Sequence, residues 1–280
     1  MQEYIEFCQK INLDDNTISI VSDYYNKNRT HILDSTNIFL NNKERKFLQF
    51  EDKLFTLSLV ISIAIKTHDD YIKRGIDDNI YYDTMKDITI WANEYYNNTQ
   101  KFGLENVGWI FLHLTLSIFK IGRLQFQPTT VPFVPLIFYC KHKKIRIPFK
   151  KQCINIHIPR GEKLDYNECI KSIRMSKDFF KQFYPEINLD NYMIISWLVD
   201  PHLKHLLDKE SNIYKFQSLF NIVCILPTNK DTNYYVFGNR KIKDIKNLPE
   251  NTSLQRRIKS YYLKGHPLGI GLGFLDFEKL

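Results

Sequence analysis

The sequence predicts an α/β protein, with a helical N-terminal domain (residues 1–120) packed on a domain with a mixed β-sheet and flanking helices (residues 121–280). Three observations predict this class. Apolar residues recur at helical spacing in the first 120 residues, they alternate in the manner of strands after Gly122, and a strand, a helix and a second strand then follow in order. A chain of 280 residues is long enough to bury a core of this kind.

The N-terminal part shows the spacing of amphipathic helices. One helix face is predicted by residues that recur at intervals of four and three: Tyr81, Met85, Ile88, Ala92 and Tyr95. A second pattern runs from Val107 to Ile118, and we expect that helix to end at Gly122 because glycine commonly terminates helices. The most apolar stretch, residues 54–65, is about twelve residues long, whereas a bilayer-spanning helix needs about twenty. It predicts a buried helix and no membrane span.

The second part begins with strand patterns. Leu124, Phe126, the stretch Val131–Tyr139 and the stretch Ile145–Phe149 are typical of strands separated by prolines and a basic turn. In Cys153–Ile158 the isoleucines alternate with polar residues, which is the period of a strand.

A loop and a capped helix follow that strand. The loop covers residues 159–164, and Asp165 with Glu168 three positions later predicts the start of a helix that ends near Pro185. The apolar run Met193–Val199 predicts a strand that is covered on both faces. A crossover of this length makes the two strands parallel.

The remaining elements are predicted in the same way. We expect a helix over 201–220 with a break near Ser211, strands over 221–226 and 234–237, a helix over 253–264, and a glycine-rich strand over 268–275. The glycines of the last strand alternate and do not form a dinucleotide-binding motif.

The composition restricts the partners and the compartment. A net charge of +8 favours polyanions such as the phosphates of coenzyme A, although an ordinary lysine-rich surface explains the same charge. The densest basic run, residues 141–146, carries no nucleic-acid-binding signature, so we expect no nucleic-acid partner. Five scattered cysteines and an N-terminus unlike a signal peptide predict reduced thiols and a cytoplasmic protein.

Several short sequence motifs in residues 121–280 resemble those of a family of GNAT-like acyltransferases that have a helical N-terminal domain and a GNAT-like C-terminal domain. The resemblance covers residues 121–256 and the glycine-rich strand after them. It rests on Ile121-Gly-Arg-Leu-Gln-Phe126, His157-Ile-Pro159 with Leu164-Asp165, Ser196-Trp-Leu-Val-Asp-Pro201, Ser211-Asn212 with Lys215-Phe-Gln217, and Thr252-Ser-Leu-Gln-Arg256. The resemblance implies transfer of an acyl group from acetyl-CoA or another acyl-CoA to an amine or similar nucleophile, and we expect the acceptor to be a small molecule or a peptide.

The loop before the capped helix is the candidate site for the pyrophosphate of CoA. A helix N-terminus attracts anions, and Arg160 and Lys163 add positive charge. With Ile158 and Gly161 these residues form the predicted cofactor-binding set. The loop departs from the Q/R-x-x-G-x-G/A pattern of the superfamily because it has a single glycine, so an ordinary strand-to-helix turn is the alternative.

His157 is the candidate general base. The strand alternation places it on the face opposite the isoleucines, and an imidazole titrates near neutral pH. A histidine that is hydrogen-bonded in the core or faces solvent is the alternative. Asp200 is the second catalytic candidate, because it lies at the carboxyl end of the next strand; its alternative is to cap the helix that begins at Pro201.

Four further residues are predicted to line the substrate cleft: Arg123, Gln125, Trp197 and Gln217. A structural hydrogen-bonding role is the alternative for the polar residues among them. His202 and His205 are three positions apart, but no acidic or cysteine ligand stands at matching spacing, so we expect no metal site.

The function predicted from the sequence is N-acyl transfer from acyl-CoA to an amine acceptor. Two alternatives stay open. A degenerate GNAT fold could bind an acyl-CoA or a peptide without catalysis, or the basic surface could belong to a nucleic-acid-associated regulatory protein, whose binding would fall steeply with salt.

Overall fold

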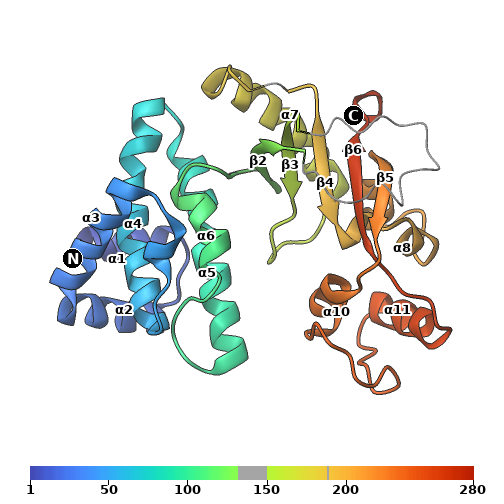
Figure 1. The fold of residues 1–280 in the computed structure, drawn as a ribbon, viewed down its shortest axis with the longest axis horizontal. Coiled ribbons are helices and arrows are strands. Elements are labelled where there is room, and N and C mark those ends of the chain that lie inside the picture. Colours follow the sequence, from blue (N-terminus) through green and yellow to red (C-terminus); the bar gives the residue numbers. More distant parts are fainter. Residues whose placement is uncertain (132–149, 188) are drawn as a thin grey trace. The chain divides into compact units, whose positions relative to one another are not determined.

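The structure is a computed structural model that describes residues 1–131, 150–187 and 189–280. The chain divides into two compact units. The first unit comprises Met1–Ile121 and Pro159–Glu162, and the second comprises Gly122–Ile158 and Lys163–Leu280 (Figure 1). The α/β class predicted from the sequence is confirmed by helices and a mixed sheet.

The first unit is built of helices. They are α1 (Gln2–Lys10), α2 (Asp15–Lys27), α3 (Arg29–Asn42), α4 (Lys53–Arg74), α5 (Asp78–Thr99) and α6 (Val107–Leu114), coloured blue to green in Figure 1. The apolar stretch at 54–65 forms the first half of α4, which packs against α1, α2, α3, α5 and α6. Its side chains from Leu57 to Ala64 are almost fully buried. The described helices include none with the length and apolar character needed to cross a membrane.

The end of α6 differs from the prediction. The helix stops at Leu114, and Phe119–Ile121 forms a short strand, β1, in place of the last helical turn. The Thr115 hydroxyl donates a hydrogen bond back to the carbonyl of Phe111 at 2.8 Å, and Leu116 adopts a positive φ of 51°. A positive φ is incompatible with a right-handed helix. Gly122, with φ of 65°, therefore forms the turn between β1 and the next strand instead of a helix end.

The second unit contains β2 (Leu124–Thr130), β3 (Gln152–His157), β4 (Tyr192–Ser196), β6 (Ile270–Leu275) and β5 (Phe220–Leu226), which are neighbours in this order. β3 and β4 are parallel, as their crossover helix predicts, and the other pairs are antiparallel. The predicted strands at Val131–Tyr139 and Ile145–Phe149, and the basic run at 141–146, lie outside the described residues except for Val131.

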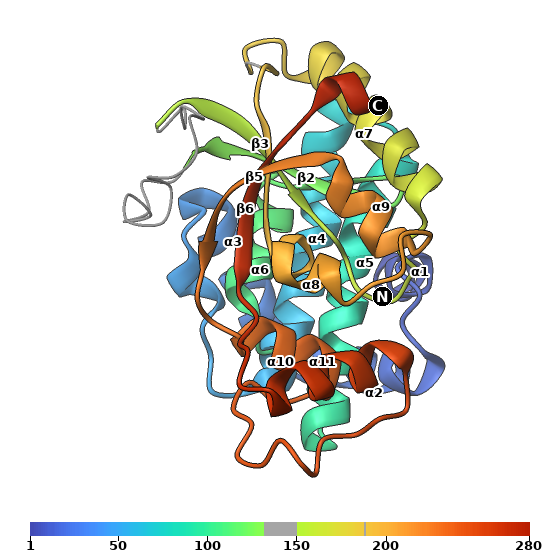
Figure 2. The same ribbon diagram turned by 90° about the vertical axis from the view of Figure 1, so that its right-hand side faces the viewer.

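Two helices cover one side of this sheet (Figure 2). α7 (Tyr166–Phe183) begins at the predicted cap, where the Asp165 carboxylate accepts a hydrogen bond from the amide of Glu168 at 3.0 Å. α7 contacts β2, α9 (Asn212–Ser218) contacts β5, and the two helices contact each other. The hydroxyl of Ser172 on α7 accepts the amide of Leu124 at 3.0 Å, which ties the helix to the start of β2.

The strand β4 is shorter than predicted, and the helical segment after it is divided. The strand ends at Ser196, whose hydroxyl accepts the amide of Leu198 and starts a 3₁₀ turn at Trp197–Val199. The predicted helix over 201–220 is two helices, α8 (Pro201–His205) and α9, and Ser211 caps the second as predicted.

One strand predicted in the last part of the chain is wrong. Tyr234–Phe237, predicted as a strand, belongs to a helix, α10 (Lys230–Phe237), which ends at Gly238 with φ of 79°. α10 lies beside α11 (Ser253–Leu263) in both views, and Thr252 with Gln255 forms a capping box for α11. The glycines of β6 allow close packing, since a Cβ atom at Gly271 would lie 2.4 Å from the carbonyl oxygen of Val199.

Candidate functional site

The ladder between the two parallel strands ends before their carboxyl ends. The ladder between β3 and β4 stops at the pair Ile156–Ile194, whereas β4 stays paired with β6 as far as Ser196. The edges of Ile195 and Ser196 that face β3 are therefore beyond the ladder. Backbone N–H and C=O groups on such an unpaired strand edge can pair with an extended ligand.

His157 lies at this end of β3 within a group of amide side chains. Its Nε2 atom is 2.9 Å from Oε1 of Gln127 on β2 and 3.1 Å from Nδ2 of Asn155 on β3. His157 and Asn155 are half-buried, and the isoleucines between and before them point to the opposite face. The structure thus places the imidazole on the face that the alternation predicted, in contact with two neutral hydrogen-bonding groups.

Two predicted cleft residues lie near the start of β2. Gln125 is fully buried and pairs in register with His157. Arg123 is 5% exposed, and its Nε atom donates a hydrogen bond to the carbonyl of Lys163 at 2.8 Å. Arg123 therefore fixes the backbone just before α7, which is the structural role left open by the sequence.

The loop between β3 and α7 is held by ion pairs within the first unit. The Arg160 guanidinium pairs with Glu94 on α5, and Glu162 pairs with Lys120 on β1. Gly161 has φ of 91°, and no described atom beyond its chain neighbours lies within 4 Å of the place that a Cβ atom would take, so its requirement for glycine is conformational. Ile158 is half-buried at the end of β3, and Lys163 is exposed. The charge of Arg160 is thus paired with a carboxylate, whereas Lys163 is exposed to solvent.

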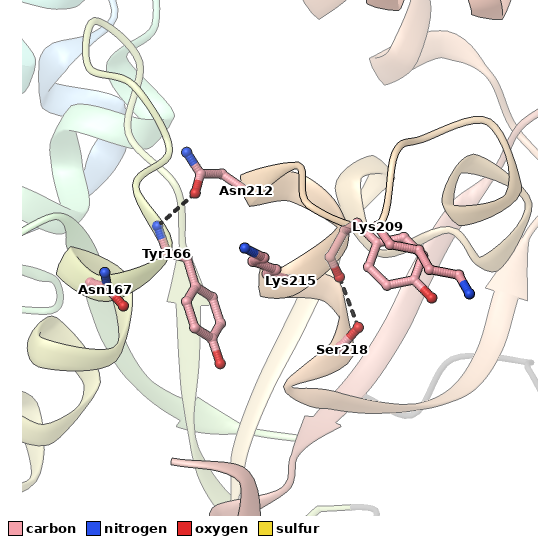
Figure 3. Close-up of a pocket in the computed structure, with 7 residues that line it drawn as sticks. Tyr166, Asn167, Lys209, Asn212, Lys215 and Ser218 are labelled. Carbon is pink, nitrogen blue, oxygen red and sulfur yellow. Dashed lines mark hydrogen bonds between the residues drawn. The ribbon is translucent and has the colours of Figure 1, made fainter.

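A pocket of about 460 Å³ lies between the start of α7 and α9 (Figure 3). Its wall on α7 is formed by Tyr166 and Asn167, and the amide of Tyr166 donates to Oδ1 of Asn212 at 3.3 Å. The other lining residues are Lys209, Tyr214, Lys215 and Ser218. The pocket combines a helix N-terminus with two lysines, so it is suited to an anion.

The charges around this pocket are unevenly distributed. Lys215 forms an ion pair with Glu210 at 2.7 Å, and both side chains are exposed. Lys204 donates to the hydroxyl of Ser218 at 2.8 Å, and burial lowers the pKa of Lys204. Lys209 is exposed. An anion that enters the pocket therefore meets cations that are accessible to it and only partly neutralised.

Asp200 is fully buried and holds several segments together. Its Oδ1 accepts the amide of His202 at 2.9 Å, which caps α8, and its Oδ2 accepts the amide of Gly269 at 2.5 Å. Nδ1 of His202 also lies 2.9 Å from Oδ1. This geometry is that of the helix-capping alternative.

Gln217 and Trp197 complete the predicted set. Gln217 is 2% exposed and donates through Nε2 to the carbonyl of Asp200 at 2.6 Å, while its Oε1 is buried with no hydrogen-bond partner among the described residues. Trp197 is half-buried in the 3₁₀ turn and stacks with Tyr235 at a centroid distance of 6.3 Å. A buried acceptor without a partner is costly unless a ligand supplies a donor.

Sequence reasoning missed several residues of the site. Gln127 comes close to His157 through the register between β2 and β3, and this register cannot be read from the sequence. Lys209 and Tyr166 come together because α9 packs on α7, and no local pattern in either segment shows this contact. Among the described residues, no group of three or more His, Cys, Asp or Glu side chains is arranged to hold a metal ion.

Two known protein families together match most of the chain. Residues 2–116 match the N-acyltransferase N-terminal domain, and residues 118–275 match the GNAT-like C-terminal domain. The comparison with curated proteins gives no match.

Solved structures of similar fold are acyltransferases. One, in complex with decanoyl-CoA and teicoplanin, has a TM-score of 0.77 at 15% identity and covers 96% of this chain and 86% of its own. A mutant acyltransferase in complex with octanoyl-CoA has a TM-score of 0.79 at 15% identity over 99% of this chain and 88% of its own. At this identity the likeness shows the fold, and the family is shown by the domains: the protein belongs to the acyltransferases with an N-acyltransferase N-terminal domain and a GNAT-like C-terminal domain.

Proposed function

We propose that the protein transfers an acyl group from acyl-CoA to an amine on a small molecule or peptide. The observation that carries this proposal is the early end of the β3–β4 ladder at Ile156–Ile194 beside the imidazole of His157. In this proposal an extended ligand lies along the unpaired edge of β4, and the imidazole supplies a base beside it. Family membership provides the reaction class.

The pantetheine arm is assigned to the edge of β4 that lies beyond its ladder with β3. Its two amides can pair with the backbone of Ile195 and Ser196 as an additional strand would, because these residues have left the ladder on the β3 side. Gln217 lies close to the same end of β4, since it contacts the carbonyls of Leu198 and Asp200. Its buried Oε1 is an acceptor for a ligand N–H in this proposal.

The phosphates of CoA are assigned to the pocket at the start of α7. Tyr166 and Asn167 lie in the first turn of α7, where the helix dipole favours an anion, and Lys209 and Lys215 line the opposite wall. Exposed Lys163 precedes this turn and adds a third cation. Arg160 remains in the proposed set as a residue that fixes the loop through Glu94, with Gly161 providing the turn.

His157 is the proposed general base. It takes a proton from the attacking amine while the nitrogen forms a bond to the thioester carbonyl carbon. The tetrahedral intermediate then collapses with cleavage of the C–S bond, and the thiolate of CoA receives a proton from the imidazolium. Asp200 stays the competing base, although both of its carboxylate oxygens accept hydrogen bonds from backbone amides.

The acyl chain and the acceptor are proposed by analogy with the similar structures. These contain octanoyl-CoA, decanoyl-CoA and teicoplanin. These complexes thus favour an acyl chain longer than acetyl for this protein as well.

Calorimetry with acetyl-CoA, octanoyl-CoA and decanoyl-CoA, followed by turnover with an amine, tests this function. We expect binding of at least one acyl-CoA and a loss of turnover of about 10²–10⁴-fold in His157→Ala with nearly unchanged acyl-CoA affinity. His205→Ala, an exposed histidine on α8, is the matched control and should keep full turnover. Full turnover in His157→Ala would mean that His157 is not the general base, and Asp200 would be tested next. The absence of binding of any acyl-CoA at millimolar concentrations would refute the proposed function.

A further inference from the structure

A second pocket of the sheet-containing unit lies where β5 ends and β6 begins. Its volume is about 550 Å³, which is in the usual range for small-molecule sites. Its lining comes from the start of α10, from the loop after α10 and from the segment between α11 and β6. The two helices lie together beyond this end of the sheet in both views (Figures 1 and 2). This pocket shares no lining residue with the pocket at the start of α7.

The charged side chains that line this pocket are basic. Lys230, Arg240 and Lys241 are exposed, and the lining includes no Asp or Glu. The Arg240 guanidinium lies 3.5 Å from the carboxylate of Asp231 and over the ring of Tyr234. Lys230 and Lys241 form no ion pair with any residue in the described part of the chain. The pocket therefore presents two ammonium groups without a compensating carboxylate.

The start of α10 adds to this positive potential. The helix begins at Lys230, and the side chain of the preceding residue, Asn229, makes no capping hydrogen bond. The first amides of a helix have no partner within the helix, and the helix dipole favours an anion beside them. Asn229 and Lys230 both line the pocket, whereas Asp231 in the same turn does not.

The buried residues of the pocket provide a polar donor and an apolar wall. Asn233 is 2% exposed, and its Nδ2 donates to the carbonyl of Arg240 at 3.4 Å. Because a carbonyl oxygen can only accept, this end of the amide is the NH₂ group, and Oδ1 accepts the hydroxyl of Tyr262 at 2.9 Å. Ile242 and Ile245 pack in one apolar cluster with Tyr262. The pocket thus suits an anionic group attached to an apolar body.

We propose that this pocket binds the carboxylate end of the acyl acceptor, which is a short peptide or a peptide-like amine with a free carboxylate. This inference rests on the proposed function. Lys230, Lys241 and the start of α10 hold the carboxylate, and the wall formed by Ile242 and Tyr262 contacts the apolar side chain next to it. A free carboxylate is the anion that a peptide amine carries at its other end.

The chain places this pocket within reach of the edge to which the pantetheine arm is assigned. Pro267 lines the pocket, Gly269 is held by Asp200, and Gly271 pairs with Ser196 on β4. Four residues lead from Pro267 to Gly271, so their Cα atoms are at most about 14 Å apart. An extended peptide of about five residues covers this distance. Its amine can then meet the thioester while its carboxylate stays in the pocket.

Titration calorimetry without acyl-CoA tests the site by itself. The probes are pentapeptides that end in leucine, phenylalanine or tyrosine, each with a free carboxylate and as the C-terminal amide. We expect at least one free-carboxylate peptide to bind about fivefold more tightly than its amide. Its affinity should fall about fivefold in Lys241→Ala and further in Lys241→Glu, and the affinity of the amide should not fall in Lys241→Ala. Lys181→Ala, near the other end of α7, is the control and should bind the peptides normally.

Turnover with octanoyl-CoA then tests the role of the site. In Lys241→Ala the KM for the free-carboxylate peptide should rise about fivefold, while the KM for its amide stays the same. The affinity for octanoyl-CoA should not change in this variant, because the two pockets share no lining residue.

The outcomes separate this inference from the proposed function. Equal binding of each peptide and its amide, equal affinities in wild type and Lys241→Glu, or no binding at millimolar concentrations would overturn the inference. Peptide binding through the carboxylate without acylation, in a protein that binds acyl-CoA, would show that the pocket does not serve the acceptor. If no acyl-CoA binds, the proposed function fails, and the calorimetric comparison of the peptides does not depend on it.

Discussion

The carboxylate of Asp200 accepts a hydrogen bond from the amide of Gly269, 69 positions further along the chain, at 2.5 Å. The same side chain caps α8 through the amide of His202, and its backbone carbonyl accepts Nε2 of Gln217. One buried residue thereby connects the end of β4, the start of α8, helix α9 and the segment that enters β6. These elements adjoin the edge of β4 to which we assign the pantetheine arm.

Replacement of Asp200 should first affect stability. Asp200→Ala removes the cap and leaves the amide of Gly269 buried without its acceptor, so we expect the free energy of unfolding to fall by about 2–4 kcal/mol. Asp200→Asn can keep one of the two contacts and should lose less. Urea denaturation gives the values, and Glu186→Ala, an exposed carboxylate of the same unit, serves as the control. An Asp200→Ala protein as stable as the wild type would show that these contacts are not structural.

The lysines of the pocket should contribute to the affinity for CoA. Removal of either ammonium, in Lys209→Ala or Lys215→Ala, should weaken CoA binding by about fivefold, since an exposed charge contact is worth up to about 1 kcal/mol. The effect should shrink at high salt. Lys181→Ala, near the other end of α7, is charge-matched and should bind CoA normally. Equal affinities for all three variants in titration calorimetry would exclude this pocket as the phosphate site.

Gly161 provides a test of the loop itself. At φ of 91° a β-branched side chain is strained, so Gly161→Val should change the path of the loop and weaken CoA binding. Gly75→Val is the matched control because Gly75 has φ of 71°, has open space at Cβ and lies at the end of α4. Both variants should lose stability, but the loss of CoA affinity should be confined to Gly161→Val. If both bind CoA as the wild type does, the loop does not take part in binding.

The buried thiols predict a decline in stability in alkaline solution. Burial raises the pKa of both Cys153 and Cys169 to about 12, whereas an exposed thiol in the unfolded chain titrates near 8.5. The stabilising contribution is complete below the unfolded value and is lost as the pH rises through the folded one. The free energy of unfolding attributable to these thiols should therefore fall between about pH 8.5 and pH 12.

Denaturation curves at several pH values can isolate this contribution. The double variant Cys153→Ala/Cys169→Ala, although less stable overall, should show a shallower decline with pH than the wild type. Both proteins carry the same tyrosines and lysines, so the difference between the slopes reports on the thiols. Parallel curves would mean that the thiols are not protected by burial.

Much of the fold could be predicted from local patterns. The alternation in β3, the Asp165 cap of α7 and the apolar core of α4 each express a preference of a few neighbouring residues. Two of the errors fell where a single local contact overrode the pattern, and the third lies in a segment that packs beside another helix. A threonine and a positive φ at Leu116 ended α6 early, the Ser196 hydroxyl converted the end of β4 into a 3₁₀ turn, and packing beside α11 accompanies a helix at Tyr234–Phe237.

The sequence alone determined the face on which His157 lies, because the side chains of a strand alternate with a period of two whatever the rest of the molecule does. It also determined the family resemblance through short motifs that follow one another along the chain. The tertiary structure decided which groups surround that histidine. The register between β2 and β3 brings Gln127 to Nε2, and the packing of α9 on α7 brings Lys209 and Lys215 to the first turn of α7. These contacts depend on how separate segments pack, and residues distant in sequence carry no local signal of their meeting.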